Sequence, residues 1–184
     1  TFAEYSGLSA TNMLTGSASA FNFSAFPQGW ALLDRTPSPG APAPALVADG
    51  YSSGVGSLKF TIAPGSPAAT GDFQLYRTIG SASLEYGETY QVQFDVKAGA
   101  SAAGKPFTAV SQLDSPPYTV FGSATFQAPT TWQRKTVSIT VTDPSTVSRR
   151  VTFGLGAITG EIEFANIYIR KGGVVPRHAH ENEQ

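Results

Sequence analysis

One segment decides the fold of this chain: residues 84–98, LEYGETYQVQFDVKA. After its glycine turn, apolar and polar side chains alternate strictly; the apolar positions are Tyr90, Val92, Phe94 and Val96. Successive side chains of a β-strand point to opposite faces, so this period of two predicts a strand with one buried and one solvated face. Such strands are typical of antiparallel sheets.

The same alternation recurs along the chain, and Pro-rich or Gly-rich turns separate the segments. The further predicted strands lie at about residues 58–62, 73–79, 107–113, 136–141, 151–155 and 161–169. Helical periodicity is nearly absent. In the segment 73–79, Arg77 is an exception, because it occupies a position on the apolar face of the predicted strand. Many short alternating strands predict an all-β protein, an antiparallel β-sandwich.

The composition excludes several classes of partner. Hydrophobic residues make up 41% of the chain, charged residues only 14%, and the formal net charge is -1. A nucleic-acid partner is not expected, because no basic surface is available. There is no cysteine, so disulfides and thiolate chemistry are excluded. Membrane insertion is not expected, because no apolar run reaches the roughly 18 residues that a spanning helix needs.

The pattern divides the chain into one domain and one arm. Residues 1–171 are expected to form a single β-sandwich domain, with a Pro-rich surface loop at about residues 35–44. From residue 172 the apolar pattern is lost, so residues 172–184 are expected to form a polar C-terminal arm. The two histidines of the chain, His178 and His180, both lie in this arm, where a solvated tail is the simplest interpretation.

A set of short motifs follows a familiar order. The motifs are Gly29-Trp30, Gly56-Ser57-Leu58-Lys59-Phe60, Leu84-x-x-Gly87-x-x-Tyr90, Lys97-Ala98, Thr130-Thr131-Trp132-Gln133 and Phe164-Ala165-Asn166-Ile167. Over about residues 21–171 this order resembles carbohydrate-binding modules of the galactose-binding-domain-like superfamily, as in families four, nine and twenty-two. The resemblance implies a jelly-roll β-sandwich that binds sugar chains and does no chemistry.

One departure from the family concerns a metal. Members of the family commonly hold a structural calcium that an Asp of the closing strand helps to bind, and Ala165 stands at that place. Calcium prefers several oxygen ligands, mostly carboxylates. The sequence therefore predicts no metal site and no cofactor, with a weak calcium site built from backbone carbonyls and Asn166 as the alternative.

The polar strand faces and nearby aromatic residues supply candidates for sugar binding. Sugar rings offer an apolar face and an edge of hydroxyls, so a binding groove needs aromatic platforms and planar amides. The candidates are Trp30, Gln74, Tyr76, Gln91, Gln93, Gln112, Tyr118 and Phe121. The plainer interpretation is that the glutamines are ordinary solvated sheet residues and that Trp30 belongs to the core.

Catalytic patterns are weak. Glu161 and Glu163 share one face of a predicted strand, and glycosidases need two carboxylates, but most acidic residues of this chain stand beside turns. With both histidines in the tail, a Ser-His-Asp or Cys-His arrangement is not expected. The glycines between Gly154 and Gly160 lack the following helix that a dinucleotide loop requires. The chain is therefore predicted not to be an enzyme, and a small hydrolase is the third alternative.

Two hypotheses for the function follow. In the first, the chain is a non-catalytic module that binds a polysaccharide or cell-surface glycan outside the cell. In the second, the same fold serves a virion structural protein of a bacterial virus, such as a capsid decoration, head spike or tail component. That protein would contact capsid or tail proteins, or copies of itself, at the virion surface. The Pro-rich loop, the polar arm and Ala165 favour the second hypothesis.

Overall fold

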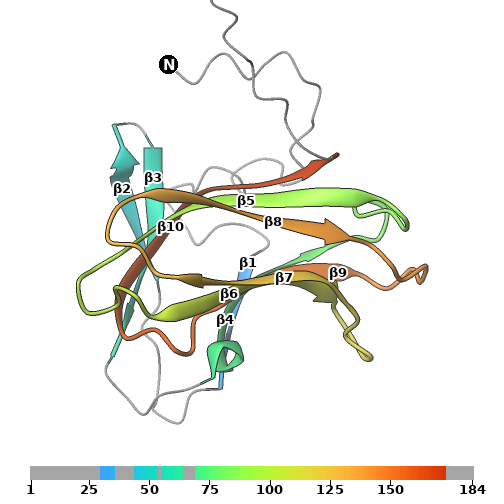
Figure 1. The fold of residues 1–184 in the computed structure, drawn as a ribbon, viewed down its shortest axis with the longest axis horizontal. Coiled ribbons are helices and arrows are strands. Elements are labelled where there is room, and N and C mark those ends of the chain that lie inside the picture. The colour runs from blue at the N-terminus through green and yellow to red at the C-terminus, as the bar shows by residue number, and fades with distance from the viewer. Residues whose placement is uncertain (1–29, 36–43, 54, 64–68, 173–184) are drawn as a thin grey trace, which may run out of the picture.

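A computed structural model describes residues 30–35, 44–53, 55–63 and 69–172. These residues form two five-stranded antiparallel sheets that pack face to face, the upper and lower layers of Figure 1. Sheet A has the order β1-β4-β9-β6-β7, and sheet B has the order β2-β3-β10-β5-β8. The predicted antiparallel β-sandwich of jelly-roll type is confirmed. The described residues contain no helix that is long and apolar enough to cross a membrane.

The strand bounds are as follows. Sheet A consists of β1 (Trp30–Asp34), β4 (Phe73–Ile79), β9 (Arg149–Gly154), β6 (Pro106–Leu113) and β7 (Val120–Gln127). Sheet B consists of β2 (Ala45–Ser52), β3 (Val55–Ile62), β10 (Gly160–Lys171), β5 (Thr89–Ala98) and β8 (Gln133–Thr140). A 3-10 turn, η3 (Thr70–Asp72), leads into β4. β9 and β10, which are consecutive in the chain, occupy the centres of opposite sheets.

The core lies between the sheets and is rich in aromatic side chains. The inward residues of β5, which are Tyr90, Val92, Phe94 and Val96, are all buried, as their alternation predicts. The ring of Phe94 lies 4.8 Å from that of Phe153 in sheet A and 6.0 Å from that of Phe164 in β10, between centroids. Because these rings come from both sheets, the aromatic cluster ties the two layers together.

In β10 the alternation of inward and outward side chains shifts by one residue part of the way along the strand. Its pairing with β5 shifts register between Ala165 and Tyr168, and Asn166 has a φ of 48°. Before this bulge the inward residues are Ile162 and Phe164; after it they are Ile167 and Ile169, and all four are fully buried. The extra residue of a β-bulge therefore keeps the apolar side chains in the core on both sides of it.

Three strands were not predicted by the sequence pattern: β1, β2 and β7. All three are edge strands of their sheets, and their described side chains are mostly half-buried or exposed. An edge strand with partly exposed faces has no reason to alternate strictly. By contrast, the prediction for Arg77 is confirmed: it lies half-buried in a row with the inward Trp30, and burial lowers the pKa of its guanidinium.

Gly122 marks the place where sheet A meets the edge strand of sheet B. A Cβ added at this position would press against the carbonyl oxygen of Ser138 and the side chain of Ile139 in β8. We expect Gly122→Ala to lower the free energy of unfolding by about 1–3 kcal/mol, because this close approach leaves no room for a methyl group. Urea unfolding measures the change.

Gly80→Ala is the matched control, because nothing lies within 4 Å of a Cβ built there. Its free energy of unfolding should stay within about 0.5 kcal/mol of the parent or rise slightly. Equal stability of the two variants would show that β7 and β8 are not in close contact at Gly122.

Some predictions fall outside the described residues. The greater part of the Pro-rich loop (36–43), the C-terminal arm from residue 173 with His178 and His180, and residues 1–29 belong to this group. The division into a domain of residues 1–171 and an arm stays a prediction.

Candidate functional site

The outward face of sheet A gathers polar and aromatic side chains around its central strand, β9. In register, Tyr76 of β4 lies beside Thr152 of β9, and Val110 of β6 lies on the other side of Thr152. We call this surface the sheet A face and define it by the outward residues of β4, β9 and β6, with the loop residue Tyr118: Gln74, Tyr76, Thr78, Arg150, Thr152, Thr108, Val110, Gln112 and Tyr118.

The central strand of the sheet A face, β9, is largely covered by side chains of the neighbouring strands. Thr152 points away from the core, yet it is only 6% exposed. The Arg150 side chain, two residues earlier on the same strand, is 16% exposed. Gly154, two residues later, is buried and contributes no side chain. The side chains of β4 and β6 therefore project further from the sheet into solvent than those of β9 do.

Three side-chain atoms on this face are buried and have no hydrogen-bond partner: Gln74 Oε1, Arg150 Nε and Thr152 Oγ1. Gln74 is held in place from its other end, because its Nε2 donates to the carbonyl oxygen of Gly71 at 2.6 Å. Buried polar atoms are nearly always paired in folded proteins, so each exception needs an explanation. Three of the six such atoms in the described part of the chain thus lie on the adjacent strands β4 and β9 of this face.

Arg150 stands between two aromatic rings of this face. Its Cζ lies 5.5 Å from the ring centroid of Tyr76 and 5.6 Å from that of Tyr118. Tyr76 belongs to β4, whereas Tyr118 belongs to the loop between β6 and β7 and is 46% exposed. Stacking of a guanidinium on aromatic rings is favourable and fixes its position.

One carboxylate borders the face. Asp114 directly follows β6; its Oδ2 accepts a hydrogen bond from Thr78 Oγ1 at 2.9 Å, and its Oδ1 lies 3.8 Å from Arg150 Nη1. The outward residues of β4, β9 and β6 themselves include no Asp or Glu. The two-carboxylate arrangement of a glycosidase is therefore not present among the described residues of this face.

The structure brings together four of the sequence-predicted site residues and separates two others. Gln74, Tyr76, Gln112 and Tyr118 all belong to the sheet A face or its border. Gln91 and Gln93 lie on β5 and face outward from sheet B, beside Ser138 and Thr136 of β8. These two glutamines therefore do not share a face with the other four residues, and a role for them in sugar binding stays a prediction. Alternation gives the face of a strand but not the sheet to which it belongs.

Trp30 and Phe121 present no platform in this structure. Trp30 is 6% exposed, and its ring stacks on that of Phe153 with centroids 6.0 Å apart. Phe121 is 7% exposed and belongs to the same core. The position of Trp30 is that of a core residue, which is the plainer interpretation given above. Both rings gain more from burial in the core than from display.

The sequence-based reasoning missed five residues of the face. Arg150 and Thr152 are the two on its central strand; the others are Thr78, Thr108 and Val110. The signal was present, since Val151, Phe153 and Leu155 alternate as inward positions and leave Arg150 and Thr152 outward. What the sequence did not give is the pairing of β9 between β4 and β6, which places these two side chains between Tyr76 and Gln112.

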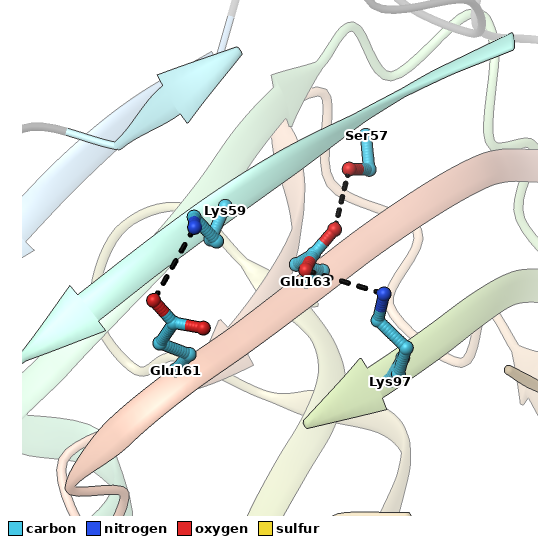
Figure 2. Close-up of polar contacts among 5 residues, drawn as sticks. All are labelled: Ser57, Lys59, Lys97, Glu161 and Glu163. Carbon is cyan, nitrogen blue, oxygen red and sulfur yellow. Dashed lines mark hydrogen bonds and ion pairs between the residues drawn. The ribbon is translucent and has the colours of Figure 1, made fainter. Parts of the chain in front are cut away.

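The outward face of sheet B is occupied by its own ion pairs (Figure 2). Lys59 Nζ contacts Glu161 Oε1 at 3.3 Å, and Lys97 Nζ contacts Glu163 Oε1 at 3.4 Å. Glu163 Oε2 also accepts a hydrogen bond from Ser57 Oγ at 2.7 Å. Glu161 and Glu163, the two carboxylates that a glycosidase would need as a pair, are therefore each neutralised by a different lysine. These ion pairs join β10 to its two neighbours, β3 and β5.

The residues near Ala165 do not fit a calcium ion. Asp95, opposite Ala165 in register, accepts hydrogen bonds from Arg134 Nε at 2.9 Å and Nη2 at 3.0 Å, and from Asn166 Nδ2 at 2.8 Å. The Arg134 guanidinium already supplies the positive charge that a cation would bring. Across the described ranges, no three His, Cys, Asp or Glu side chains gather to hold a metal.

Tyr51 and Trp132 lie beside this ion pair. The two rings meet edge to face, with centroids 5.0 Å apart, and Lys97 Nζ lies 5.0 Å from the Trp132 centroid. Burial raises the pKa of the Tyr51 hydroxyl, and the negative charge of Asp95 raises it further. The aromatic rings of the sheet B face are thus engaged by neighbouring side chains.

The comparisons with known structures agree on the fold. A solved family 4 carbohydrate-binding module (CBM4) superposes with a TM-score of 0.59 at 20% identity, covering 88% of this chain and 95% of that one. The CBM22-1 xylan-binding domain of Paenibacillus barcinonensis Xyn10C gives a TM-score of 0.57 at 13% identity, with 90% and 94% covered. At these identities the likeness concerns the fold alone.

A third structure comes from a virus. The enzymatically active domain of Bacteriophage CBA120 tailspike protein 4 matches with a TM-score of 0.56 at 16% identity, covering 88% of this chain but only 21% of that one. No curated protein matches the sequence of this chain. A partial match at this identity again concerns only the sandwich fold, so contacts with capsid or tail proteins stay a prediction.

A family model settles what the fold alone leaves open. The model, described as a carbohydrate binding domain, matches residues 45–157, which is more than half of the chain. The matched range begins at β2, ends just after β9, and contains all residues of the sheet A face. The chain belongs to the carbohydrate binding domain family CBM_4_9.

Proposed function

We propose that the sheet A face binds a polysaccharide without transforming it. The observation that carries the proposal is the set of three buried, unpartnered polar atoms on that face: Gln74 Oε1, Arg150 Nε and Thr152 Oγ1. A sugar hydroxyl both donates and accepts, so it can satisfy an amide oxygen, a guanidinium N–H and a threonine hydroxyl alike. Membership of a carbohydrate binding domain family supports this assignment.

The arrangement suits a chain of sugars. The outward residues Tyr76, Thr152 and Val110 lie in one row across β4, β9 and β6, and this row extends over roughly 10 Å, at about 4.8 Å between neighbouring strands. This length exceeds a single ring, so the bound unit is an oligosaccharide stretch of a longer polymer. Tyr76 and Tyr118 supply ring surface for the apolar side of a sugar. The affinity of one such site is modest, and repetition on an enzyme or particle raises it.

The non-catalytic part of the proposal has its own support. Asp114, which borders the sheet A face, is already bonded to Thr78 and lies near Arg150. The expected place of action is outside the cell, where polysaccharides occur. Binding without release of reducing sugar from the same polymer is the expected result.

The test replaces Tyr76 and compares it with a residue on the opposite face. We expect Tyr76→Ala to weaken binding to the polymer by about tenfold or more, since it removes a ring and the stacking partner of Arg150. Affinity electrophoresis through gels with xylan, mixed-linkage β-glucan or glucuronoxylan measures the loss. Gln93→Ala, on the sheet B face, is the control and should bind as the parent does.

Two outcomes would contradict the assignment. Loss of binding in Gln93→Ala with retention in Tyr76→Ala would move the site to sheet B. Failure of the folded parent chain to bind any of these polymers, or any other glycan of a broad array, would remove the function itself. Thermal unfolding of each variant shows that a loss of binding is not a loss of fold.

A further inference from the structure

We propose that the polysaccharide bound by the sheet A face carries carboxylate groups, as in a hexuronic acid, and that Arg150 binds one of them. This inference rests on the proposed function, because it names the ligand class of that same site. The guanidinium of Arg150 is the one positive charge among the outward residues of β4, β9 and β6. A single cation at the centre of a face otherwise made of amides, hydroxyls and tyrosines selects for one negative group.

The three arginines of the chain that lie near the ends of β8 and β9 differ in how they are satisfied. Arg134 makes a two-pronged contact with Asp95 at 2.9 Å and 3.0 Å. Arg149 donates to three backbone carbonyl oxygens. The guanidinium of Arg150 makes no hydrogen bond within the described part of the chain, and its Nε, like that of Arg149, is buried without an acceptor. The donors of Arg150 are therefore available to a ligand, whereas those of its neighbours are mostly committed.

Asp114 compensates the charge of Arg150 only in part. The 3.8 Å between Asp114 Oδ1 and Arg150 Nη1 exceeds the length of a hydrogen bond, and the other oxygen of Asp114 is bonded to Thr78. A carboxylate that met the guanidinium directly would gain two parallel, charge-assisted hydrogen bonds. Such a bidentate contact is roughly twice as strong per bond as one between neutral groups, which favours a carboxylate over a hydroxyl as the ligand group.

The two tyrosines prepare Arg150 for this contact. Tyr76 and Tyr118 hold the guanidinium from two different elements, so little side-chain freedom remains to be lost on binding. The chain as a whole carries a net charge of -1, so it has no general attraction for acidic polymers. Preference for an acidic polymer would therefore originate locally, at Arg150, rather than from the overall charge.

The experiment compares one polymer in two forms. The full chain is titrated calorimetrically with glucuronoxylan and with the same glucuronoxylan after its carboxylates are reduced to alcohols. We expect the reduced polymer to bind roughly tenfold more weakly, or worse, at physiological salt. Arg150→Gln should remove the preference between the two forms, and Arg150→Lys should restore only part of it, because an ammonium lacks the planar fork.

Two further variants separate a specific contact from general charge. Arg170→Gln removes a matched guanidinium, which lies 5.2 Å from the Tyr168 ring on the outward side of sheet B, and should bind as the parent does. Asp114→Asn should increase affinity for the acidic polymer by about two- to threefold, because it removes a competing carboxylate. Equal loss in Arg170→Gln, or equally tight binding of dextran sulfate, would show nonspecific charge attraction and overturn the inference.

The two proposals fail in different ways. Equal binding of both forms of the polymer, lost in Tyr76→Ala but kept in Arg150→Gln, would overturn the carboxylate inference and leave the proposed function intact. Absence of binding to either form, and to the neutral polymers, by the folded chain would overturn both.

Discussion

Phe94→Ala is expected to lower the free energy of unfolding by about 3–5 kcal/mol, the largest effect of any single substitution considered for this protein. Phe94 is fully buried on β5. Its ring lies 4.8 Å from that of Phe153, 5.7 Å from that of Phe126 and 6.2 Å from that of Phe107, between centroids. All three partners belong to sheet A, so the substitution opens a cavity between the two layers. That cavity cannot collapse without moving a sheet.

Urea unfolding followed by fluorescence measures the loss, and two variants bracket it. Tyr86→Ala, which truncates a 61% exposed ring, should change stability by no more than about 0.5 kcal/mol. Phe94→Leu should cost less than Phe94→Ala because it refills part of the volume. Domains of this kind are stable by about 5–15 kcal/mol, so Phe94→Ala removes a large share. A change below 1 kcal/mol would show that the layers are not packed through Phe94.

Arg149→Met is expected to lower the free energy of unfolding by about 2–4 kcal/mol, although it replaces a buried charge with an apolar chain of similar length. Arg149 is 1% exposed at the start of β9. Its Nη1 donates to Val147 O at 2.9 Å, and its Nη2 donates to Asp143 O at 3.1 Å and Ser145 O at 2.9 Å. Without the guanidinium, three carbonyl groups of one loop lose their donor.

The alternative outcome has a clear physical meaning. Replacing a buried charge by an apolar side chain is sometimes neutral, when the cost of removing the charge from water equals the gain from its contacts. Stability of Arg149→Met at or above that of the parent would place this arginine in that class. Arg149→Lys is the second variant, because it keeps the charge but cannot reach three carbonyl groups with a planar fork, and it should also be destabilised. Calorimetric melting compares the three proteins.

The fold was largely predictable because its signal is local. A strand with one buried face must alternate, and apolar and polar residues alternate over Tyr90 to Val96 of β5. Of the outward residues in this stretch, only Asp95 is buried, beneath its hydrogen bonds with Arg134 and Asn166. The edge strands β1, β2 and β7 were missed for the same reason, since little of their surface is buried and the sequence is free to vary. Arg77 shows the converse case: a charged residue takes an inward position because the rest of its strand requires that phase.

The site was only half predictable because its signal is not local. Gln74 and Gln93 look equivalent in sequence, as outward amides on alternating strands, yet β4 and β5 belong to different sheets. Only the pairing of strands far apart in the chain tells them apart. Arg150 gains its interest from Tyr76 and Tyr118, two rings contributed by distant segments. A pattern read along one strand contains no information on such neighbours.

The bulge at Asn166 has a consequence for how sequences of this kind are compared. With the bulge, even-numbered positions of β10 face the core up to Phe164, and odd-numbered positions face it from Ile167 onward. The strand thus contains a change of phase, and the two halves obey opposite rules of parity. A comparison that scores period-two patterns without a gap would place Tyr168 and Arg170 in the core and Ile167 and Ile169 in water. If a related sequence without the bulge is aligned with no gap at this point, its inward residues after the bulge are paired with outward residues of this chain. The similarity of the two closing strands is then hidden.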